Sequence, residues 1–446
     1  MNAYYLIGEH LGHSFSAELH RLFGRYDYAL KELSPGELGP FLRARAFAGL
    51  NVTIPYKEAV LPYLDRLDET AAAVGAVNTV VNRDGELWGY NTDLGGMRGA
   101  FRRLGLSLNG KTVLILGTGG SSKTALALCR DLGAAELFRV SRTGRAEALR
   151  YEEAYARFGR TLPCSPASDA PHLSPVCALV TPSPEGEGSG LAEHPELVII
   201  NCSPVGMWPR TEEMPLDPAD FPRLAGVFDC VYNPLRTRLV LEAQKRGVPA
   251  SGGLYMLVKQ AALACELFTG LPVEDAQVDR IYDTLRRKRE NIVLIGMPGA
   301  GKTTVGRLLA QKTGKEFVDL DEELVRRAGK SIPTLFAEVG EAGFRDLETG
   351  LIRELAFPGG RIVATGGGAV LRVENVLRLK QSGRLIWLDR PLEALEPSGD
   401  RPLGDTLEKL RKLYAERCPL YRAAADLVIS DTETPEAAAR AILEER

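Results

Sequence analysis

Residues 291–310, NIVLIGMPGAGKTTVGRLLA, run from an apolar strand through a glycine-rich turn into a helix. The turn at residues 296–303 matches the phosphate-binding pattern GxxxxGK[ST] in full. In such a loop the backbone N–H groups surround the phosphates, Lys302 reaches the β- and γ-phosphates, and Thr303 ligates magnesium. The complete pattern between a strand and a helix favours a nucleotide site over a purely structural turn. The residues that we expect to contact the nucleotide here are Gly299, Ala300, Gly301, Lys302, Thr303 and Thr304.

A second glycine turn lies far upstream, in residues 112–129, TVLILGTGGSSKTALALC. Glycines let the backbone approach a pyrophosphate, while a helix N-terminus offers N–H groups and a positive dipole end. By itself the turn could be only a tight connection between a strand and a helix. The expected cofactor contacts are Gly117, Thr118, Gly119, Gly120 and Ser121.

The strand that follows narrows the choice of cofactor. It ends at Ser141-Arg142-Thr143, where a dinucleotide-binding fold presents the group that reads the adenosine ribose. NAD-binding forms place Asp or Glu there, whereas Arg142 and Arg145 offer forked donors for a 2′-phosphate. The pattern favours NADP(H).

Short β-rich runs alternate with helical patterns through most of the sequence, which indicates parallel α/β sheets. At 446 residues it exceeds one ordinary domain, so we expect two or three. The expected central strands are residues 4–7, 112–116, 137–140, 198–201, 226–229, 291–295, 361–364 and 385–388. Residues 162–194, rich in Pro, Ser and Gly, look like a surface insertion, with a mobile lid as the alternative. A helix at residues 279–290 marks the expected seam between domains.

Composition excludes several classes of function. A net charge of -3 gives no electrostatic reason to expect a nucleic acid or an anionic membrane as partner. Seven scattered cysteines without a CxxC pair suggest neither a disulfide framework nor a zinc site, and fit a reducing cytoplasm. The first ten residues, MNAYYLIGEH, carry no export signal, and no apolar run approaches the ~18 residues of a membrane span. The five histidines lack ligand spacing, so we expect no transition metal.

The N-terminal third supplies polar groups that suit a small, hydroxyl-rich acid. A dehydrogenase that acts on a secondary alcohol needs a group to take the hydroxyl proton as hydride leaves, and Lys57 paired with Asp93 could supply it. Alternatively, Lys57 is a solvated lysine and Asp93 is an N-cap. The polar groups are Ser14, Ser16, Asn51, Thr53, Lys57, Asn78, Asn91 and Asp93.

Nine short motifs in order make residues 1 to about 285 resemble the shikimate dehydrogenase family. They are SFS (14–16), NVTIPYK (51–57), GAVNT (75–79), NTD (91–93), GTGG (117–120), SRT (141–143), INCSPVGM (200–207), DCVYNP (229–234) and GLYMLVKQAA (253–262). The resemblance implies that Lys57 and Asp93 form the catalytic pair. It implies that shikimate or 3-dehydroshikimate is bound by Ser14, Ser16, Thr53, Asn78, Asp93, Tyr232 and Gln260. It also implies an NADP site of residues 117–121 with Ser141, Arg142, Thr143, Arg145, Cys230 and Gly253.

The rest of the chain, from Asn291 onward, resembles shikimate kinase. The signals are FVDLDEEL (317–324), GFRDLE (343–348), ATGGGAV (364–370), DRPL (400–403) and ERCPLY (416–421). From the residues alone, Asp319 could hold magnesium through water and Asp321 could act as base, or either could cap a helix. The resemblance implies that shikimate is bound by Asp321, Arg345, Gly367 and Arg417, with Asp321 catalytic and Arg401 reaching over ATP from a lid.

Together these patterns predict a bifunctional enzyme that uses NADPH to reduce 3-dehydroshikimate and MgATP to phosphorylate the shikimate formed. The expected fold is an α/β substrate domain (1–95 and 250–288), a Rossmann NADP domain (96–249) and a P-loop kinase domain with a parallel sheet (289–446). Two alternatives are a quinate or shikimate dehydrogenase that uses NAD, and a chain in which one half only senses its ligand. The oligomeric state and any direct transfer of shikimate between sites stay open.

Overall fold

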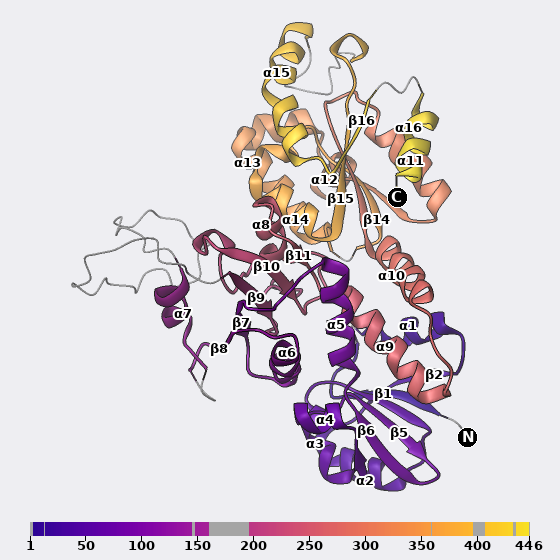
Figure 1. Ribbon diagram of the computed structural model, residues 1–446. Coiled ribbons are helices and arrows are strands. Elements are labelled where there is room, and N and C mark those ends of the chain that lie inside the picture. Colours follow the sequence, from indigo (N-terminus) through magenta and orange to yellow (C-terminus); the bar gives the residue numbers. More distant parts are fainter. Residues whose placement is uncertain are drawn as a thin grey trace, which may run out of the picture. The chain divides into compact units, whose positions relative to one another are not determined.

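The computed structural model describes residues 3–12, 14–144, 148–159, 196–357, 359–395, 406–430 and 434–445. The chain divides into two compact units, Met1–Leu285 and Arg286–Arg446. The described residues form three β-sheets, two in the first unit and one in the second (Figure 1). Among the described residues, no helix is long and apolar enough to cross a membrane.

The first sheet contains six strands in the order β2-β1-β3-β5-β6-β4. Its strands are β1 (Tyr4–Gly8), β2 (Tyr28–Glu32), β3 (Gly49–Val52), β4 (Arg66–Leu67), β5 (Thr79–Arg83) and β6 (Glu86–Tyr90). The parallel arrangement expected for most of the chain does not extend over this whole sheet, because β5 pairs antiparallel with both β3 and β6. The cause is local: Asp84 and Gly85 both adopt positive φ, which suits a two-residue hairpin turn and returns the chain beside itself.

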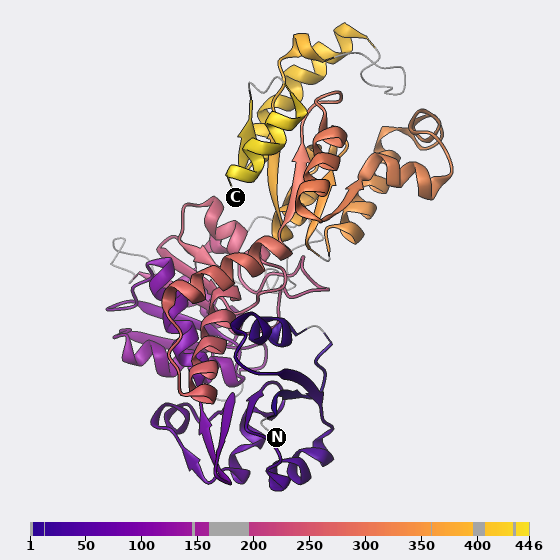
Figure 2. The same cartoon turned by 90° about the vertical axis from the view of Figure 1, so that its right-hand side faces the viewer.

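Helices from distant parts of the sequence pack around this six-stranded sheet. They are α1 (Ser16–Phe23), α2 (Pro35–Ala44), α3 (Tyr56–Ala59), η1 (Leu61–Tyr63), α4 (Glu69–Val74), α5 (Thr92–Leu104), α9 (Leu254–Thr269) and α10 (Asp275–Arg289). Figures 1 and 2 show α5 and α9 running side by side, so the chain returns after residue 250 to the half that it first built. The predicted helix at 279–290 is the last part of α10.

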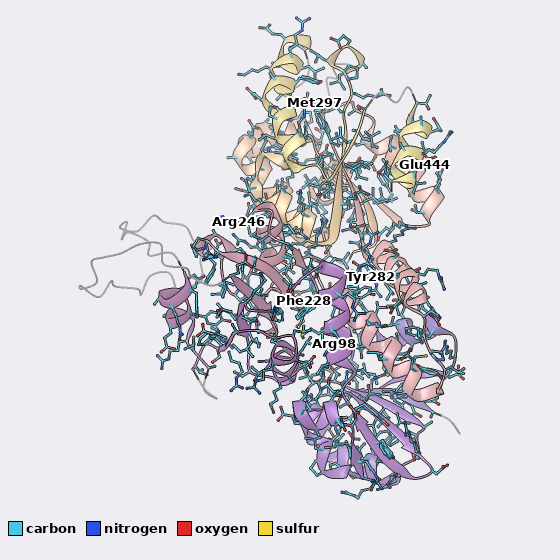
Figure 3. All side chains as sticks on the ribbon, viewed as in Figure 1. Arg98, Phe228, Arg246, Tyr282, Met297 and Glu444 are labelled. Carbon is cyan, nitrogen blue, oxygen red and sulfur yellow. The ribbon has the colours of Figure 1, made fainter. Side chains whose placement is uncertain are left out.

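The second sheet is parallel throughout, in the order β11-β10-β9-β7-β8. Its elements are β7 (Thr112–Leu116), α6 (Gly120–Asp131), β8 (Glu136–Val140), α7 (Tyr151–Phe158), β9 (Leu197–Asn201), η3 (Pro218–Asp220), β10 (Leu224–Asp229), α8 (Arg238–Lys245) and β11 (Ala250–Ser251). Apolar clusters cover both faces: Val113 belongs to one cluster and Leu114 to the other. Phe228, labelled in Figure 3, is fully buried on β10 and meets Phe101 edge to face at 5.1 Å. Burial on both faces explains why these strands read as continuous apolar runs.

The second unit holds one parallel sheet in the order β13-β14-β12-β15-β16. Its elements are β12 (Asn291–Ile295), α11 (Lys302–Thr313), β13 (Glu316–Asp319), α12 (Leu320–Ala328), α13 (Ile332–Leu355), β14 (Arg361–Ala364), η4 (Ala369–Leu371), α14 (Val373–Ser382), β15 (Gly383–Leu388), η5 (Leu392–Ala394), α15 (Leu407–Ala424), β16 (Leu427–Ile429) and α16 (Pro435–Glu444). Trp387 and Tyr421 anchor its core. Because β12 is central and ends at the glycine turn, the turn opens at the carboxyl edge of the sheet, where α/β folds bind ligands.

The structure contains a strand at each of the eight predicted positions. The predicted insertion at 162–194 lies outside the described residues.

Candidate active sites

Lys57 and Asp93 form a close ion pair in the first unit. Lys57 Nζ lies 2.5 Å from Asp93 Oδ2, and the two side chains are 16% and 10% exposed. The N-cap of α5 is Asn91, whose side chain accepts the N–H of Leu94, so Asp93 is not the cap. A Cβ on Gly120 would lie 3.5 Å from Lys57 Cδ, so the lysine stem runs beside the first glycine turn. The pair therefore lies between the six-stranded sheet and the glycine turn at residues 117–120.

A buried amide and hydroxyl network lies next to this pair. Asn78 Nδ2 donates to Thr92 Oγ1 at 3.0 Å and to Gln260 Oε1 at 3.5 Å, and Asn78 Oδ1 accepts the N–H of Thr92 at 2.7 Å. The structure thus brings together predicted residues that are 182 positions apart in sequence. Thr92 links the two amides and was not among the predicted residues, because a threonine in the first turn of a helix gives no distinctive signal.

The loop with Ser14 and Ser16 is fixed from two sides. Ser14 Oγ donates to Ser16 Oγ at 3.1 Å, and Glu32 Oε1 accepts the N–H of Leu11 at 2.7 Å. Glu32, at the end of β2, was not predicted because that strand itself was not. The ring of Phe15 lies 5.2 Å from that of Tyr232, so the predicted residues of this loop and of the 229–234 loop are neighbours. Thr53 follows β3, and its N–H donates to Ile7 O.

Two glycines at the proposed NADP site, Gly117 and Gly253, lie in close contact with the backbone of other loops. Gly117 has φ 109°, and a Cβ there would lie 3.2 Å from the Cys202 carbonyl. A Cβ on Gly253 would lie 2.2 Å from Cys230 O, so only glycine fits at that position. Gly119 precedes α6, whose first turn has no side-chain cap. These features leave a cradle of backbone groups that suits a pyrophosphate.

The residues predicted to read the ribose follow β8, directly beside that turn. Gly117 donates its N–H to Val140 O, and Ser141 Oγ accepts the N–H of Gly144. Arg142 and Thr143 are exposed at this edge. Arg145 lies outside the described residues.

A buried carboxyl group joins two loops of this half. Asp229 accepts hydrogen bonds from Asn201 Nδ2 (3.0 Å), Val231 N (3.0 Å) and Thr237 Oγ1 (2.7 Å). Burial raises the pKa of Asp229 to about 7 despite these donors. Asn201 in turn accepts both the N–H and the hydroxyl of Ser203. The motifs INCSPVGM and DCVYNP contain all of these residues except Thr237, but the sequence pattern did not predict that the two motifs contact each other.

The second unit contains a cavity of about 370 Å³ above the second glycine turn. Predicted residues that line it are Gly299, Gly301, Lys302, Thr303, Thr304, Asp319, Asp321, Arg345, Gly367 and Arg417. Ala300 is buried behind the loop. Lys302 Nζ donates to the carbonyls of Gly296 and Met297 at 2.9 Å. The cavity therefore brings together residues from the glycine turn near position 299 and from α15 near position 417.

Asp319 both contacts the second glycine turn and caps the helix α12. Its Oδ2 accepts the hydroxyl of Thr303 at 2.6 Å, while Oδ1 accepts the N–H of Asp321 and of Glu322 at the start of α12. The helix-capping alternative therefore holds for Asp319, without removing it from the cavity.

Two carboxyl groups and an arginine form the opposite wall. Arg345 Nη1 donates to Glu348 Oε2 at 2.8 Å, whereas Arg345 Nε and Glu348 Oε1 are buried without a partner. A Cβ on Gly366 would lie within 2.8 Å of both Glu348 Oε1 and Asp321 Oδ1. Burial, reinforced by Asp319 and Glu348, raises the pKa of Asp321 to about 6, and burial also raises that of Glu348. Arg345, Glu348 and Asp321 all line the cavity, so this wall presents charged groups that suit a polar ligand.

Glu348 was not predicted, although its signal was in the sequence: it follows Arg345 by three positions on α13, which places both on one helix face. Gly368 lies flat under the Arg345 guanidinium, because a Cβ there would be 2.2 Å from Cζ. Arg417 reaches the same place from α15, 3.4 Å from a Cβ built on Gly367. Arg401 and its lid lie outside the described residues.

Comparison with known proteins assigns both parts of the chain to known families. A family model for the shikimate dehydrogenase substrate binding domain matches residues 6–80, and one for shikimate kinase matches residues 298–446. The NADP(+)-type shikimate dehydrogenase of Moorella thermoacetica is 36% identical over 286 residues, which cover 62% of this chain and 90% of that protein. The chain belongs to the shikimate dehydrogenase family. Its C-terminal part is a shikimate kinase domain.

Solved structures support the dehydrogenase assignment. Shikimate dehydrogenase 1 from Peptoclostridium difficile has a TM-score of 0.52 at 30% identity and covers 64% of this chain and 98% of its own. A chorismate mutase/shikimate 5-dehydrogenase fusion protein from Clostridium acetobutylicum has a TM-score of 0.53 at 29% identity, with coverages of 65% and 98%.

The bifunctional interpretation is therefore confirmed: the chain combines shikimate dehydrogenase (NADP+) and shikimate kinase, two activities of the shikimate pathway. NADP as the dehydrogenase cofactor also agrees with these relatives, against the NAD alternative. Among the described residues, no group of three His, Cys, Asp or Glu side chains lies close enough together to hold a metal ion.

Proposed function

We propose that Lys57 is the proton donor when 3-dehydroshikimate is reduced at the first site. Bound NADPH supplies the hydride that reaches the ketone carbon. Lys57 gives a proton to the ketone oxygen, and Asp93 orients the ammonium through their 2.5 Å contact. That contact, beside Gly120 of the glycine turn, is the observation that supports the assignment most directly.

The polar groups around the pair suit a ring that carries hydroxyls and a carboxylate. The Ser14 and Ser16 hydroxyls are on one loop, and the amides of Asn78 and Gln260 are already connected through Thr92. We infer that these groups, with Thr53 and Tyr232, bind the substrate. Because Asn78 and Gln260 use part of their capacity on Thr92, their orientation is set before substrate arrives.

The glycine turn and Ser141-Arg142-Thr143 would hold NADP(H). The fit rests on the backbone cradle at Gly117 and on the absence of room for a side chain at Gly253. Arg142 is exposed at the edge where a 2′-phosphate would lie.

In the kinase domain we infer that Arg345 and Arg417 bind the carboxylate of shikimate while Asp321 takes the proton of its 3-hydroxyl. Both arginines line the cavity together with Asp321, which supports a ligand with a carboxylate at this wall. ATP with Mg²⁺ supplies the phosphoryl group and neutralises its charge. The loop at residues 299–304 would hold the phosphates, and the Thr303–Asp319 pair offers the oxygen ligands that Mg²⁺ prefers.

We retain the three-domain division as part of the proposal: residues 1–95 with 250–288, residues 96–249, and residues 289–446. The return of α9 to α5 supports grouping the first two segments.

The test is one assay with 3-dehydroshikimate, NADPH and MgATP, in which NADPH loss and ADP formation are followed together. We expect NADPH loss without ATP, and ADP formation only once shikimate has formed. Binding of ATP and shikimate without ADP would instead mean that the kinase domain only senses its ligands. Lys57→Ala should abolish the first signal and, with shikimate supplied, leave the second intact.

A further inference from the structure

Two cysteines stand at matching positions on neighbouring strands of the NADP half. Cys202 directly follows β9 and Cys230 directly follows β10, and the strands pair in register up to Asn201 and Asp229. Cys230 N donates to Asn201 O at 2.8 Å, which continues the register by one position. The two Sγ atoms lie 3.7 Å apart.

The geometry allows these thiols to join. Neighbouring strands lie ~4.8 Å apart, and disulfides span Cα separations of ~4.4–6.8 Å. The sulfurs would have to approach by roughly 1.7 Å to reach bonding distance, so formation of the bond draws the two residues toward each other. Both cysteines are half-buried, so a small reagent has access, whereas the other described cysteines of the same unit, Cys129 and Cys265, are buried.

The same two residues support both glycine contacts of the proposed NADP site. The backbone of Cys202 lies against Gly117, and the carbonyl of Cys230 lies against Gly253. Neither glycine has room to spare: the clearances from a Cβ position are 3.2 and 2.2 Å. Pulling the two sulfurs together would therefore move the walls against which the cofactor packs.

We propose that Cys202 and Cys230 are a redox-sensitive dithiol that a low-molecular-weight disulfide oxidises to a Cys202–Cys230 disulfide, and that the oxidised form binds NADPH more weakly. This inference rests on the proposed place of the NADP site. It adds a modification site to the dehydrogenase and predicts no change in kinase activity.

The chemistry balances without another reagent. The Cys230 thiolate attacks one sulfur of the small disulfide, which forms a mixed disulfide and releases one small thiol. The Cys202 thiolate then attacks the Cys230 sulfur and releases the second small thiol. Two protein thiols are oxidised, one small disulfide is reduced to two thiols, and the two cysteine protons pass to the leaving thiolates.

The order of attack follows from the environment of Cys202. Its hydrogen bond to Cys230, together with burial, raises the pKa of Cys202 well above the ordinary value. A thiol held in its protonated form is a poor first nucleophile. Cys230 therefore attacks first, and Cys202 completes the bond from contact distance.

The experiment treats reduced full-length protein with oxidised glutathione and removes the excess. Peptide mass spectrometry without reductant should then show residues 202 and 230 linked, with two hydrogens lost and no glutathione retained. The dissociation constant for NADPH, measured by fluorescence titration, should rise at least tenfold and return with dithiothreitol. Kinase turnover on added shikimate should stay constant, and bound NADPH should slow the oxidation.

Two variants separate this effect from general thiol damage. The double variant Cys202→Ser/Cys230→Ser is compared with itself before and after treatment and should show no change in NADPH affinity. Cys265→Ala, which removes another thiol of the same unit, should remain as sensitive as the wild type.

The outcomes distinguish this inference from the proposed function. Absence of the link, retention of glutathione on residue 202 or 230 of the wild type, or a link that leaves NADPH affinity unchanged would each overturn the dithiol proposal. A reduced protein that fails to bind NADPH would instead refute the placement of the NADP site.

Discussion

Asp321→Asn should stabilise the kinase domain while abolishing its activity. The pKa of this carboxyl is raised to about 6 from 3.8, mainly by burial and further by Asp319 and Glu348, against the opposing effect of Lys302. Because the folded-state pKa exceeds the unfolded one, the folded state binds the proton more tightly. The carboxyl's contribution to stability is therefore fully present below pH 3.8 and is lost as the pH rises through about 6.

The size of the effect follows from that shift. Two pH units correspond to about 3 kcal/mol that ionised Asp321 costs the folded domain at pH 8. Asparagine removes the charge but adds N–H groups that need acceptors, which returns part of the gain. We expect a net gain of roughly 1–3 kcal/mol at pH 8. At pH 5 the gain should be smaller by about 1.4 kcal/mol, because the folded carboxyl is then largely protonated while the unfolded one is still ionised.

Differential scanning calorimetry of the full chain at pH 5 and pH 8 measures the change in stability of the kinase domain. The unfolding transition of the dehydrogenase serves as internal reference. Asp346→Asn is the matched control: Asp346 has an exposed side chain paired with Arg372, so its loss should give no gain. An Asp321→Asn gain of equal size at both pH values, or none at pH 8, would refute the electrostatic reasoning. Retained kinase turnover would refute the role of Asp321 as base.

Three further changes test other parts of the two sites. Lys57→Met should lower dehydrogenase kcat by ~10²–10⁴ without lowering kinase turnover; an unchanged NADPH oxidation rate would exclude the proton-donor role. Gly253→Ala forces a methyl group onto the Cys230 carbonyl, a strain of roughly 1–3 kcal/mol, and should raise KM for NADPH about tenfold or more; an unaltered KM would show that the loop yields freely. Glu32→Ala removes the acceptor for Leu11 N and should raise KM for shikimate several-fold with KM for NADP+ unchanged, whereas Glu32→Gln restores it; equal effects of both variants would argue against a positioning role.

Local patterns predicted several strands that are buried on both sides, although the fully buried β3 was not among them. Strands such as β7 and β12 were found because parallel strands covered by helices read as apolar runs. Strand β2 was not found: it lies at the sheet edge, and its residues are half-buried or exposed. The antiparallel β5 was missed because its hairpin turn, Asp84-Gly85, was not used as a turn signal.

The candidate sites divide in the same way. Residues in short motifs, such as Lys57 and Asp321, were predicted, because their chemistry and spacing are visible along the chain. Residues that act by touching another motif were not: Glu348 matters through Arg345 and Asp321, and Asp229 matters through Asn201. Such contacts depend on how loops at the carboxyl ends of neighbouring strands approach one another.

The place where the kinase domain joins the dehydrogenase follows from how the first unit is closed. Helices α9 and α10 pack with α1, and Leu285 is the last fully buried residue of that cluster. Because Gln260 on α9 also binds Asn78, the proposed substrate site is incomplete until this returning segment is in place. The kinase sheet begins at Asn291, after residues 286–290, and its core draws only on later residues. A second domain added at this point interrupts neither core, whereas one inserted before α9 would separate Gln260 from the site that it completes.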